Sequence, residues 1–370
     1  DHHECCSLPG VLEEALDDNV ELDKPEEKGW DVNKPFGPTS EFKTQVSEGT
    51  WMSCDVSPDG KTIVFDLLGD IYIMGIEGGE AVALTNGPAW DIQPSYSPDG
   101  QTIVFTSDRS GGDNIWTMDL SGENTHQITN ESFRLLNNPV FTPEGEYIIA
   151  RKHFVKSRSL GAGEMWRYHI SGKGSGNQLT EKRDWQHDAG EPDVSSDGRY
   201  VYYSQDASPG KTFQYNRDPY RTIYAIDRYD THTGETKRIT AGPGGAATPQ
   251  ISPDGKTLAF VRRVGLKTVL FIRDLESGNE FSVFDKLNRD AQETWAIFGV
   301  HPGFGWTPDN KSVVISGGGV FWKVDVETES YSEIPFTVNV QQTLTNAIQF
   351  DFPAWEEEFQ VKALRNVRVS

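Results

Sequence analysis

The sequence repeats one reverse-turn motif, Ser-Pro-Asp-Gly or a close variant of it, six times along the 370-residue chain. The copies begin at Ser57, Ser97, Thr142, Ser195, Ser252 and Thr307, so neighbouring copies lie 40 to 57 residues apart. A run rich in β-branched and aromatic residues follows each copy, as in "KTIVFDLL" and "QTIVFTSD". Short strands that recur with this period are typical of the blades of a β-propeller.

Each repeat contains four strand-like segments. A short segment precedes the motif and an apolar segment follows it. A third segment carries an aromatic residue or Ile among alternating polar residues, as in "DNIWTMDL", and a fourth follows a Gly-containing turn, as in "THQIT". The pattern predicts an all-β fold, a six-bladed β-propeller of the TolB-like type with four antiparallel strands per blade.

The repeated motif itself has a structural explanation. Proline presets φ for the first central position of a type I turn, Asp bonds back to the backbone, and Gly accepts a positive φ. Because the motif recurs in every repeat whereas a functional site does not, Pro58, Asp59, Gly60 and their counterparts are interpreted as hairpin residues and not as catalytic carboxylates.

Charge and composition exclude several classes of function. The net charge of −22 argues against nucleic acid or an anionic membrane as a partner, because both require a basic surface. No stretch has the roughly 18 to 20 apolar residues that cross a bilayer, so no membrane insertion is expected. Cys5, Cys6 and Cys54 have neither zinc-site spacing nor a disulfide framework.

The chain divides into three parts on the basis of these patterns. Residues 1–40 are acidic and are predicted to form an extended arm, with a short helical turn around Val11–Leu16. Residues 41–340 form the propeller, with an outermost strand at Phe42–Val46. Residues 341–370 are predicted to be a linker followed by the first strand of a further repeat, or by a strand that closes the propeller. The sequence leaves open through which end the ring closes.

The motif, the "I-W/Y-x-M/V-D" strand and the terminal "L-T" or "I-T" resemble the TolB-like β-propeller repeat over residues 42 to 336. The segments "SEGTWMSCDVSPDGKTIVFDLLGDIY" and "QYNRDPYRTIYAIDRYDTHTGE" are most similar to the N-terminal propeller region of a large bacterial amidohydrolase family. This resemblance implies an exported protein, periplasmic or extracellular, in which a metal-dependent amidohydrolase barrel follows the propeller.

The catalytic signature of that family is missing from this sequence. None of the eight histidines forms the His-x-His pair that holds metal in an amidohydrolase barrel, and no Gly-x-Ser-x-Gly motif is present. No catalytic residue can therefore be transferred, and this chain alone is expected not to be catalytic. Whether the complete protein is a metal-dependent amidohydrolase is left open.

Candidate binding residues come from the segments that precede each innermost strand, because these converge on one mouth of a propeller channel. They are Trp90, Asp91, Asn138, Trp185, His187, Asp188, Glu191, Trp295 and His301. His187, Asp188 and Glu191 could bind a cation, but their spacing matches no metal motif, and a structural or polar role is favoured. For the three tryptophans, packing between blades is favoured over a binding platform.

Three functions are compatible with the sequence. The first is a non-catalytic propeller module of an exported amidohydrolase-like protein, which interacts with or gates a downstream catalytic domain. The second is a freestanding TolB-like propeller that binds a protein partner. The third is a Ca²⁺-dependent small-molecule hydrolase that uses channel carboxylates. No cofactor is expected, apart from possible Ca²⁺ at the channel in the third case.

Overall fold

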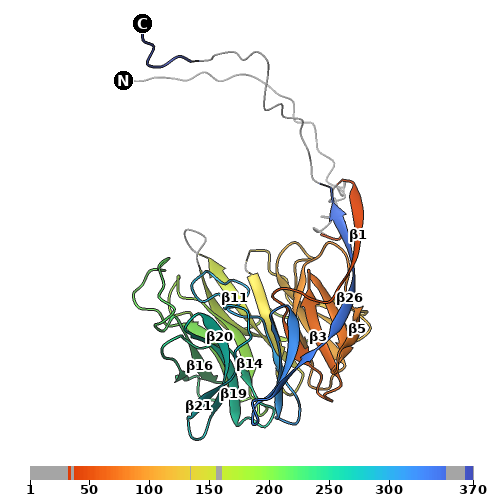
Figure 1. Cartoon of the computed structure of the whole chain (residues 1–370), viewed down its shortest axis with the longest axis vertical. Helices are drawn as coiled ribbons and strands as arrows, with labels where there is room; N and C mark the ends of the chain where they lie inside the picture. Colours follow the sequence, from red (N-terminus) through yellow and green to blue (C-terminus); the bar gives the residue numbers. More distant parts are fainter. Residues whose placement is uncertain (1–31, 35–36, 134, 156–160, 347–362, 370) are drawn as a thin grey trace, which may run out of the picture. The chain divides into compact units, whose positions relative to one another are not determined.

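The computed structural model describes residues 32–34, 37–133, 135–155, 161–346 and 363–369, and in these ranges all regular elements are strands. They form six sheets arranged as the blades of a propeller (Figure 1). The predicted six-bladed, TolB-like all-β fold is thus confirmed. Among the described residues, no helix has the length and apolar character needed to cross a membrane.

Five blades contain four antiparallel strands each, in chain order from the channel outward. Blade 2 consists of β6 (Asp91–Tyr96), β7 (Thr102–Ser107), β8 (Asn114–Asp119) and β9 (His126–Gln127). Blade 3 consists of β10 (Leu135–Phe141), β11 (Tyr147–Val155), β12 (Gly161–His169) and β13 (Asn177–Gln178). Blade 4 consists of β14 (Ala189–Val194), β15 (Tyr200–Asp206), β16 (Tyr224–Asp230) and β17 (Thr236–Thr240). Blade 5 consists of β18 (Ala247–Ile251), β19 (Thr257–Val264), β20 (Lys267–Asp274) and β21 (Glu280–Phe284). Blade 6 consists of β22 (Gly305–Trp306), β23 (Ser312–Gly317), β24 (Val320–Asp325) and β25 (Tyr331–Ile334).

Blade 1 has six strands and receives both ends of the propeller. Its own strands are β2 (Cys54–Val56), β3 (Thr62–Leu67), β4 (Asp70–Gly75) and β5 (Gly79–Ala83). Strand β26 (Phe336–Thr345) pairs in parallel with β5, and β1 (Thr39–Val46) pairs antiparallel with β26. The predicted outermost strand at Phe42–Val46 is therefore present.

The ring closes by packing blade 6 against blade 1, and β26 reinforces this closure. The backbone N–H of Cys54 donates to the carbonyl of Gly303 at 2.9 Å. The buried rings of Phe65 in β3, Phe321 in β24 and Phe336 in β26 contact one another, with centroids 5.0 to 5.7 Å apart. Such aromatic contacts stabilise a fold beyond the area that they bury.

The structure describes part of the predicted C-terminal region, residues 341–346 and 363–369. Residues 363–369 are exposed and form no strand, and the strand that joins the end of the propeller to blade 1 is β26. The alternative, a first strand of a further repeat, stays a prediction. The predicted arm, including the helical turn at Val11–Leu16, and the linker at 347–362 lie largely or wholly outside the described residues.

The six repeated turns connect each innermost strand with the next strand, as the sequence predicts. In each turn the backbone N–H of the fourth residue donates to the carbonyl of the first, at 2.8 to 3.1 Å. The fourth residue has a φ between 62° and 74°, and it is Gly in five turns and Asn310 in the sixth. Gly dominates this position because it adopts a positive φ without steric cost.

The same turns also contact one another around the channel. A Cβ on Gly60 would lie 3.1 Å from Pro308 of the preceding blade, and a Cβ on Gly100 would lie 3.3 Å from Pro58. Between the last two blades, Asn310 Oδ1 accepts a hydrogen bond from the backbone N–H of Asp254 at 2.9 Å. We call the end of the propeller formed by these six turns the turn face, and the opposite end the loop face.

Candidate functional site

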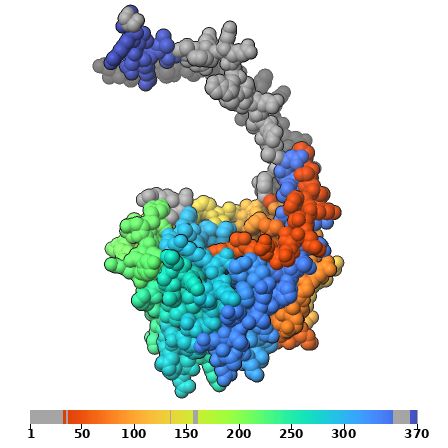
Figure 2. Space-filling view, viewed as in Figure 1, coloured from red at the N-terminus to blue at the C-terminus, as the bar shows by residue number. Residues whose placement is uncertain are grey.

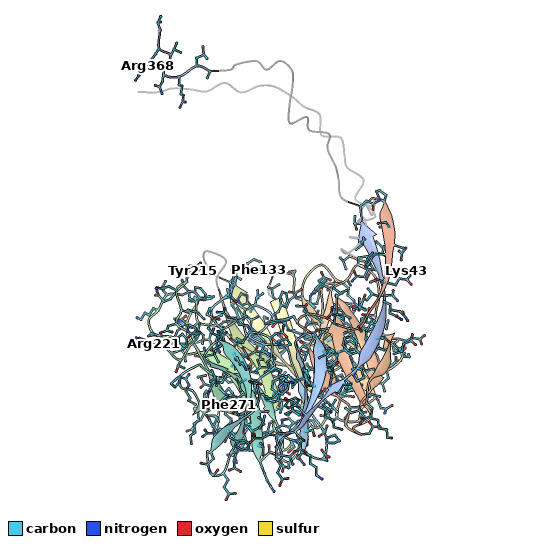
Figure 3. The ribbon with its side chains drawn as sticks, in the orientation of Figure 1. Lys43, Phe133, Tyr215, Arg221, Phe271 and Arg368 are labelled. Carbon is cyan, nitrogen blue, oxygen red and sulfur yellow. The ribbon has the colours of Figure 1, made fainter. Side chains whose placement is uncertain are left out.

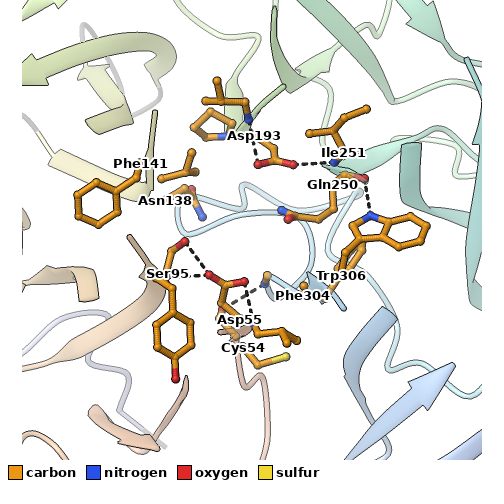
Figure 4. A pocket seen from close by; sticks show the side chains of 18 of the residues that line it. Cys54, Asp55, Ser95, Asn138, Phe141, Asp193, Gln250, Ile251, Phe304 and Trp306 are labelled. Atoms are coloured by element: carbon orange, nitrogen blue, oxygen red, sulfur yellow. Dashed lines mark hydrogen bonds between the residues drawn. The ribbon is translucent and has the colours of Figure 1, made fainter. Parts of the chain in front are cut away.

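The six innermost strands surround a central channel with a cavity of about 280 Å³ (Figure 4). Two rings of residues line the channel. Each innermost strand contributes the residues four and two positions before its repeated turn. The ring nearer the loop face consists of Ser53, Gln93, Asn138, Glu191, Thr248 and Gly303. The ring nearer the turn face consists of Asp55, Ser95, Val140, Asp193, Gln250 and Gly305. Equivalent positions thus carry different chemistry in each blade.

In four blades the ring nearer the loop face is built on a backbone irregularity. Gln93, Asn138, Glu191 and Thr248 have φ between 50° and 57°, and each is followed by Pro. The register between the first two strands shifts at these positions in blades 2 to 5. A β-bulge re-aims a side chain, and left-handed non-Gly residues cluster at functional sites. The channel therefore has a strained polar ring.

Asp55 and Asp193 lie in the other ring and connect neighbouring blades. Asp55 accepts hydrogen bonds from Ser95 Oγ at 2.9 Å and from the backbone N–H of Tyr96 at 2.8 Å. Asp193 accepts a hydrogen bond from the backbone N–H of Ile251 at 2.6 Å. Burial raises the pKa of both carboxyl groups, that of Asp193 to about 7, and the negative charge of Asp55 adds to the effect at Asp193.

Residues 285–304 connect β21 to β22 and cross the loop-face end of the channel, and we call them the capping loop. The carbonyl of Phe298 accepts a hydrogen bond from Gln93 Nε2 at 2.6 Å, which reaches blade 2. The carbonyl of Ile297 accepts one from Asn137 Nδ2 at 2.8 Å, which reaches blade 3. In Figure 4 a light-blue segment, the colour of residues near 300, passes behind the lining side chains.

Glu191 and His301 join the capping loop to the channel wall. The Glu191 carboxylate accepts hydrogen bonds from the backbone N–H groups of Val300 and His301, and from Ser204 Oγ. Burial raises the pKa of Glu191 and lowers the pKa of His301 to about 4. His301 Nδ1 lies 2.9 Å from the carbonyl of Pro302. A neutral imidazole must donate there, so its Nε2 is an acceptor.

Arg151 anchors the capping loop through a fully buried ion pair. Its guanidinium is 2% exposed, pairs with Asp188, and donates to the carbonyl of Ala189 at 2.9 Å. It also donates to the carbonyl of Ile297 at 2.8 Å. One side chain thereby joins blade 3, blade 4 and the capping loop. A second buried pair, Arg263 with Asp290, holds the start of the loop at 2.6 Å.

The structure separates the nine predicted site residues into two groups. Asn138, Glu191 and His301 line the channel. The other six lie outside the channel lining, and four of them are buried or partly buried. Asp91 pairs with Arg109 at 2.7 Å, His187 Nδ1 lies 2.6 Å from Asp184, Asp188 pairs with Arg151, and Trp295 packs against His153 with ring centroids 5.7 Å apart.

Trp90 and Trp185 complete that second group. They are 51% and 38% exposed on the loop face, so neither is a fully buried wedge between blades. Lys182 lies over the ring of Trp185, with Nζ 4.6 Å from its centroid. A binding role for the nine residues stays a prediction.

His187, Asp188 and Glu191 do not form one constellation. Their side chains contact Asp184, Arg151 and the capping loop, respectively. Among the residues that the structure describes, no group of three or more His, Cys, Asp or Glu side chains is arranged to hold a metal ion. Ca²⁺ at the channel stays a prediction.

Sequence reasoning missed Asp55, Asp193 and Arg151. The two aspartates had a usable signal, since both lie two residues before a repeated turn, and alternation in the innermost strand directs that position inward. Arg151 had no such signal, because its partners lie 37 and 146 residues away in the chain.

Residues 39–215 match the family model described as the TolB beta propeller domain. Over 192 residues, the chain is 28% identical to the uncharacterized peptidase YuxL of Bacillus subtilis, which covers 52% of this chain and 24% of that protein. Over 111 residues it is 31% identical to the Tol-Pal system protein TolB of Wolinella succinogenes, covering 29% and 26%. The matches span about a quarter of the length of these two relatives.

Solved structures show the same fold. TolB from Acinetobacter baumannii superposes with a TM-score of 0.56 at 18% identity, covering 78% of this chain and 65% of that chain. The tricorn protease superposes with a TM-score of 0.53 at 12% identity, covering 83% and 36%. The chain therefore has a six-bladed β-propeller fold like that of TolB. At these identities the likeness shows the fold alone, and the amidohydrolase resemblance stays a prediction.

Proposed function

We propose that this TolB-like propeller is a non-catalytic module of an exported, amidohydrolase-like protein, and that it docks on the catalytic domain through its loop face. The observation that carries the proposal is the distribution of exposed apolar side chains. Nine of the eighteen large apolar side chains that are exposed among the described residues lie on the loop face, whereas none of the six repeated turns contributes one. Exposed apolar patches of this kind mark interaction surfaces.

Chain topology places these side chains. Segments that precede an innermost strand, and those between the second and third strands of a blade, all lie on the loop face. The exposed members are Trp51, Leu68, Trp90, Phe133, Trp185, Tyr215, Tyr220, Leu266 and Phe298. Figure 3 shows Phe133 and Tyr215 at this end of the propeller. Aromatic residues are enriched where proteins bind one another.

The positions of the first and last strands of the propeller, β1 and β26, also support docking at the loop face. Gln342 in β26 donates to the carbonyl of Leu68, which lies in a loop-face turn, and β26 continues beyond it to Thr345. Strand β1 begins beside that end of β26, with Thr39 opposite Thr345 (Figure 2). A domain connected through either strand would start next to the loop face. The peptidase YuxL and the tricorn protease, of which this chain covers 24% and 36%, are longer proteins.

The polar groups of the chain are compatible with a non-catalytic role. The pair most like a catalytic dyad is His187–Asp184, and His187 Nε2 is buried without a hydrogen-bond partner. A nucleophile activated by this imidazole would have to lie within hydrogen-bond reach of Nε2. The capping loop also crosses the channel at the proposed docking face, where it bonds to blades 2 and 3.

Hydrogen–deuterium exchange tests the proposal on the complete protein encoded by the gene and on the 370-residue chain. We expect segments 86–91 and 181–187 to exchange more slowly in the complete protein. Turn-face segments 97–100 and 252–255 should exchange equally in both and serve as the internal control. Protection on the turn face alone, or a gene that encodes no further domain, would overturn the proposal and favour a freestanding protein-binding propeller.

Two exposed loop-face residues provide matched variants. Trp90→Ser and Tyr220→Ser should remove the protection and lower hydrolysis by the complete protein. Val82→Ser replaces a residue that is 62% exposed on strand β5, and it should change neither. An equal effect of all three variants would show that the loop face has no special part in docking.

A further inference from the structure

The capping loop crosses the channel at the loop face. Turn residues line the channel at the turn face, where Pro58, Pro98, Ser196 and Pro253 contribute to its wall. We propose that the channel is a binding site for an organic cation with several N–H donors, an ammonium or a guanidinium group. In a polypeptide this group would be a Lys or Arg side chain that inserts from the turn face.

The first argument is the charge of the lining. Three carboxylates line the cavity, those of Asp55, Asp193 and Glu191. No Lys or Arg is among the residues that line it. Figure 4 shows Asp55 and Asp193 projecting into the channel from different sides, with Asn138 and Gln250 between them. In such a buried space an opposite charge interacts more strongly than in water.

The second argument is a set of buried polar atoms without hydrogen-bond partners. His301 Nε2 and Thr248 Oγ1 are buried and unpaired, and both residues are 2% exposed and line the cavity. Asn138 Oδ1, also in the lining, is buried and unpaired as well. Leaving buried polar groups without partners is costly, so each points to a missing partner.

These unpaired atoms define the chemistry of the ligand. The neutral His301 Nε2 and the amide oxygen of Asn138 are acceptors, and a hydroxyl also accepts. The three unpaired buried atoms of the lining can therefore all accept a hydrogen bond. An ammonium group offers three donors and a guanidinium group offers five, and both form charge-assisted hydrogen bonds with carboxylates. An anion or an apolar ligand would leave the acceptors unpaired.

The wall also suits the stem of a long cationic side chain. Val140, Ile251 and Phe304 line the cavity together with the polar residues. Lys and Arg carry apolar methylene stems that pack on such surfaces while the charged head reaches polar groups. Ca²⁺ fits less well, because it requires six to eight oxygen ligands, and the Asp55 and Asp193 carboxylates already accept backbone N–H groups.

This inference is independent of the proposed docking, because the cation enters from the turn face and binds inside the channel, whereas docking uses exposed side chains of the loop face. Loss of docking would leave the channel site unchanged, and loss of cation binding would leave loop-face protection unchanged.

Isothermal titration calorimetry tests the inference with capped Gly-Lys-Gly and Gly-Arg-Gly peptides, with a Gly-norleucine-Gly peptide as the uncharged control. Separate titrations with spermidine and with Ca²⁺ distinguish a polypeptide side chain from a free polyamine and from a metal ion. We expect the Lys and Arg peptides to bind and the norleucine peptide not to bind. Binding of spermidine without binding of the peptides would identify a free polyamine as the source of the cation.

Three variants locate the site. Asp193→Asn should weaken binding about tenfold or more, because a hydrogen bond to a charged group is lost. Asp66→Asn is the matched control, because Asp66 is a buried carboxylate that also bridges two blades, at Ser53 and Gln93, but lies outside the channel lining. Thr248→Val removes a hydroxyl that has no partner, so it should weaken binding without lowering the unfolding midpoint.

Several outcomes would overturn the inference. These are binding of the norleucine peptide as strong as that of the Lys peptide, equal effects of Asp193→Asn and Asp66→Asn, and binding of Ca²⁺ alone. Absence of binding of every organic cation in the millimolar range, with protein that unfolds normally, would also overturn it.

Discussion

The two faces of the propeller use the same residue types in opposite ways. On the turn face, five aspartates of the repeated turns accept a hydrogen bond from the Ser or Thr two residues earlier, at 2.5 to 2.7 Å, and this bond lowers their pKa. Towards the loop face, burial raises the pKa of Asp188 and Glu191. Repetition therefore marks exposed, locally satisfied scaffold residues.

The loop face differs because its segments are not repeated. Each connection there has its own length and sequence, and one of them, the capping loop, reaches blades 2, 3, 4 and 5. Many of the polar contacts of the capping loop are with residues far away in the chain. The hydrogen bonds of a repeated turn lie mostly within that turn, whereas a single substitution in the capping loop affects contacts with several blades at once.

The largest expected effect is at the loop face, from Arg151→Met. The variant leaves Asp188 buried without its cation, and breaking a buried ion pair costs about 3 to 5 kcal/mol. The free energy of unfolding, measured by urea denaturation, should fall by this amount, and exchange at residues 297–301 should accelerate. Arg199→Met is the control, since its pair with Asp230 is partly exposed, and its unfolding midpoint should not move. A stable Arg151→Met protein would show that the capping loop does not depend on this pair.

The second effect concerns Asp193 in the channel between the two faces, and it is measured as the pH dependence of the free energy of unfolding. Burial raises the pKa of Asp193 to about 7, so the folded state keeps a proton that the unfolded state has lost. The free energy of unfolding should therefore decrease as the pH rises from about 4 through about 7, by up to about 1.4 kcal/mol per pH unit. Asp193→Asn removes this contribution, and its stability relative to wild type should improve by about 2 kcal/mol between pH 5 and pH 8.

His301 makes the comparison with wild type necessary. Burial lowers its pKa to about 4, which adds an opposite dependence between about pH 4 and pH 6.5. The residue is the same in both proteins, so its contribution cancels in the difference. Parallel pH profiles of wild type and Asp193→Asn would show that Asp193 titrates normally.

The smallest effect is expected on the turn face, from Gly60→Ala. Gly60 has a φ of 71°, and a Cβ would lie 3.1 Å from Pro308. A left-handed residue other than Gly costs about 1 to 2 kcal/mol, and the contact with blade 6 adds to it. Gly234→Ala has a similar φ of 75° with no atom within 4 Å of the new Cβ, so it reports the backbone cost alone. Equal losses for both variants in urea denaturation would show that the contact between turns contributes nothing.

The fold could be predicted because its signals are local. The β-branched and aromatic run in "QTIVFTSD", the turn residues Pro58 and Gly60, and the period of the repeat each depend on neighbours in the chain. The structure contains the strands that they indicate. The candidate site could be predicted only in part. Asn138, Glu191 and His301 line the channel. Asp188 instead pairs with Arg151, and His187 contacts Asp184, and no sequence pattern predicted these two pairs.

The sequence by itself determined six blades, four strands in each, and the chemistry of the turn that begins every hairpin, because turn and strand preferences act over a few residues. Only the tertiary structure decided that β1 and β26 both join blade 1, that residues 285–304 cross one end of the channel, and that Asp55 and Asp193 line its wall. The physical reason is that these contacts join residues far apart in the chain, such as Arg151 with Ile297, and their stability comes from burial and hydrogen bonding in the assembled ring.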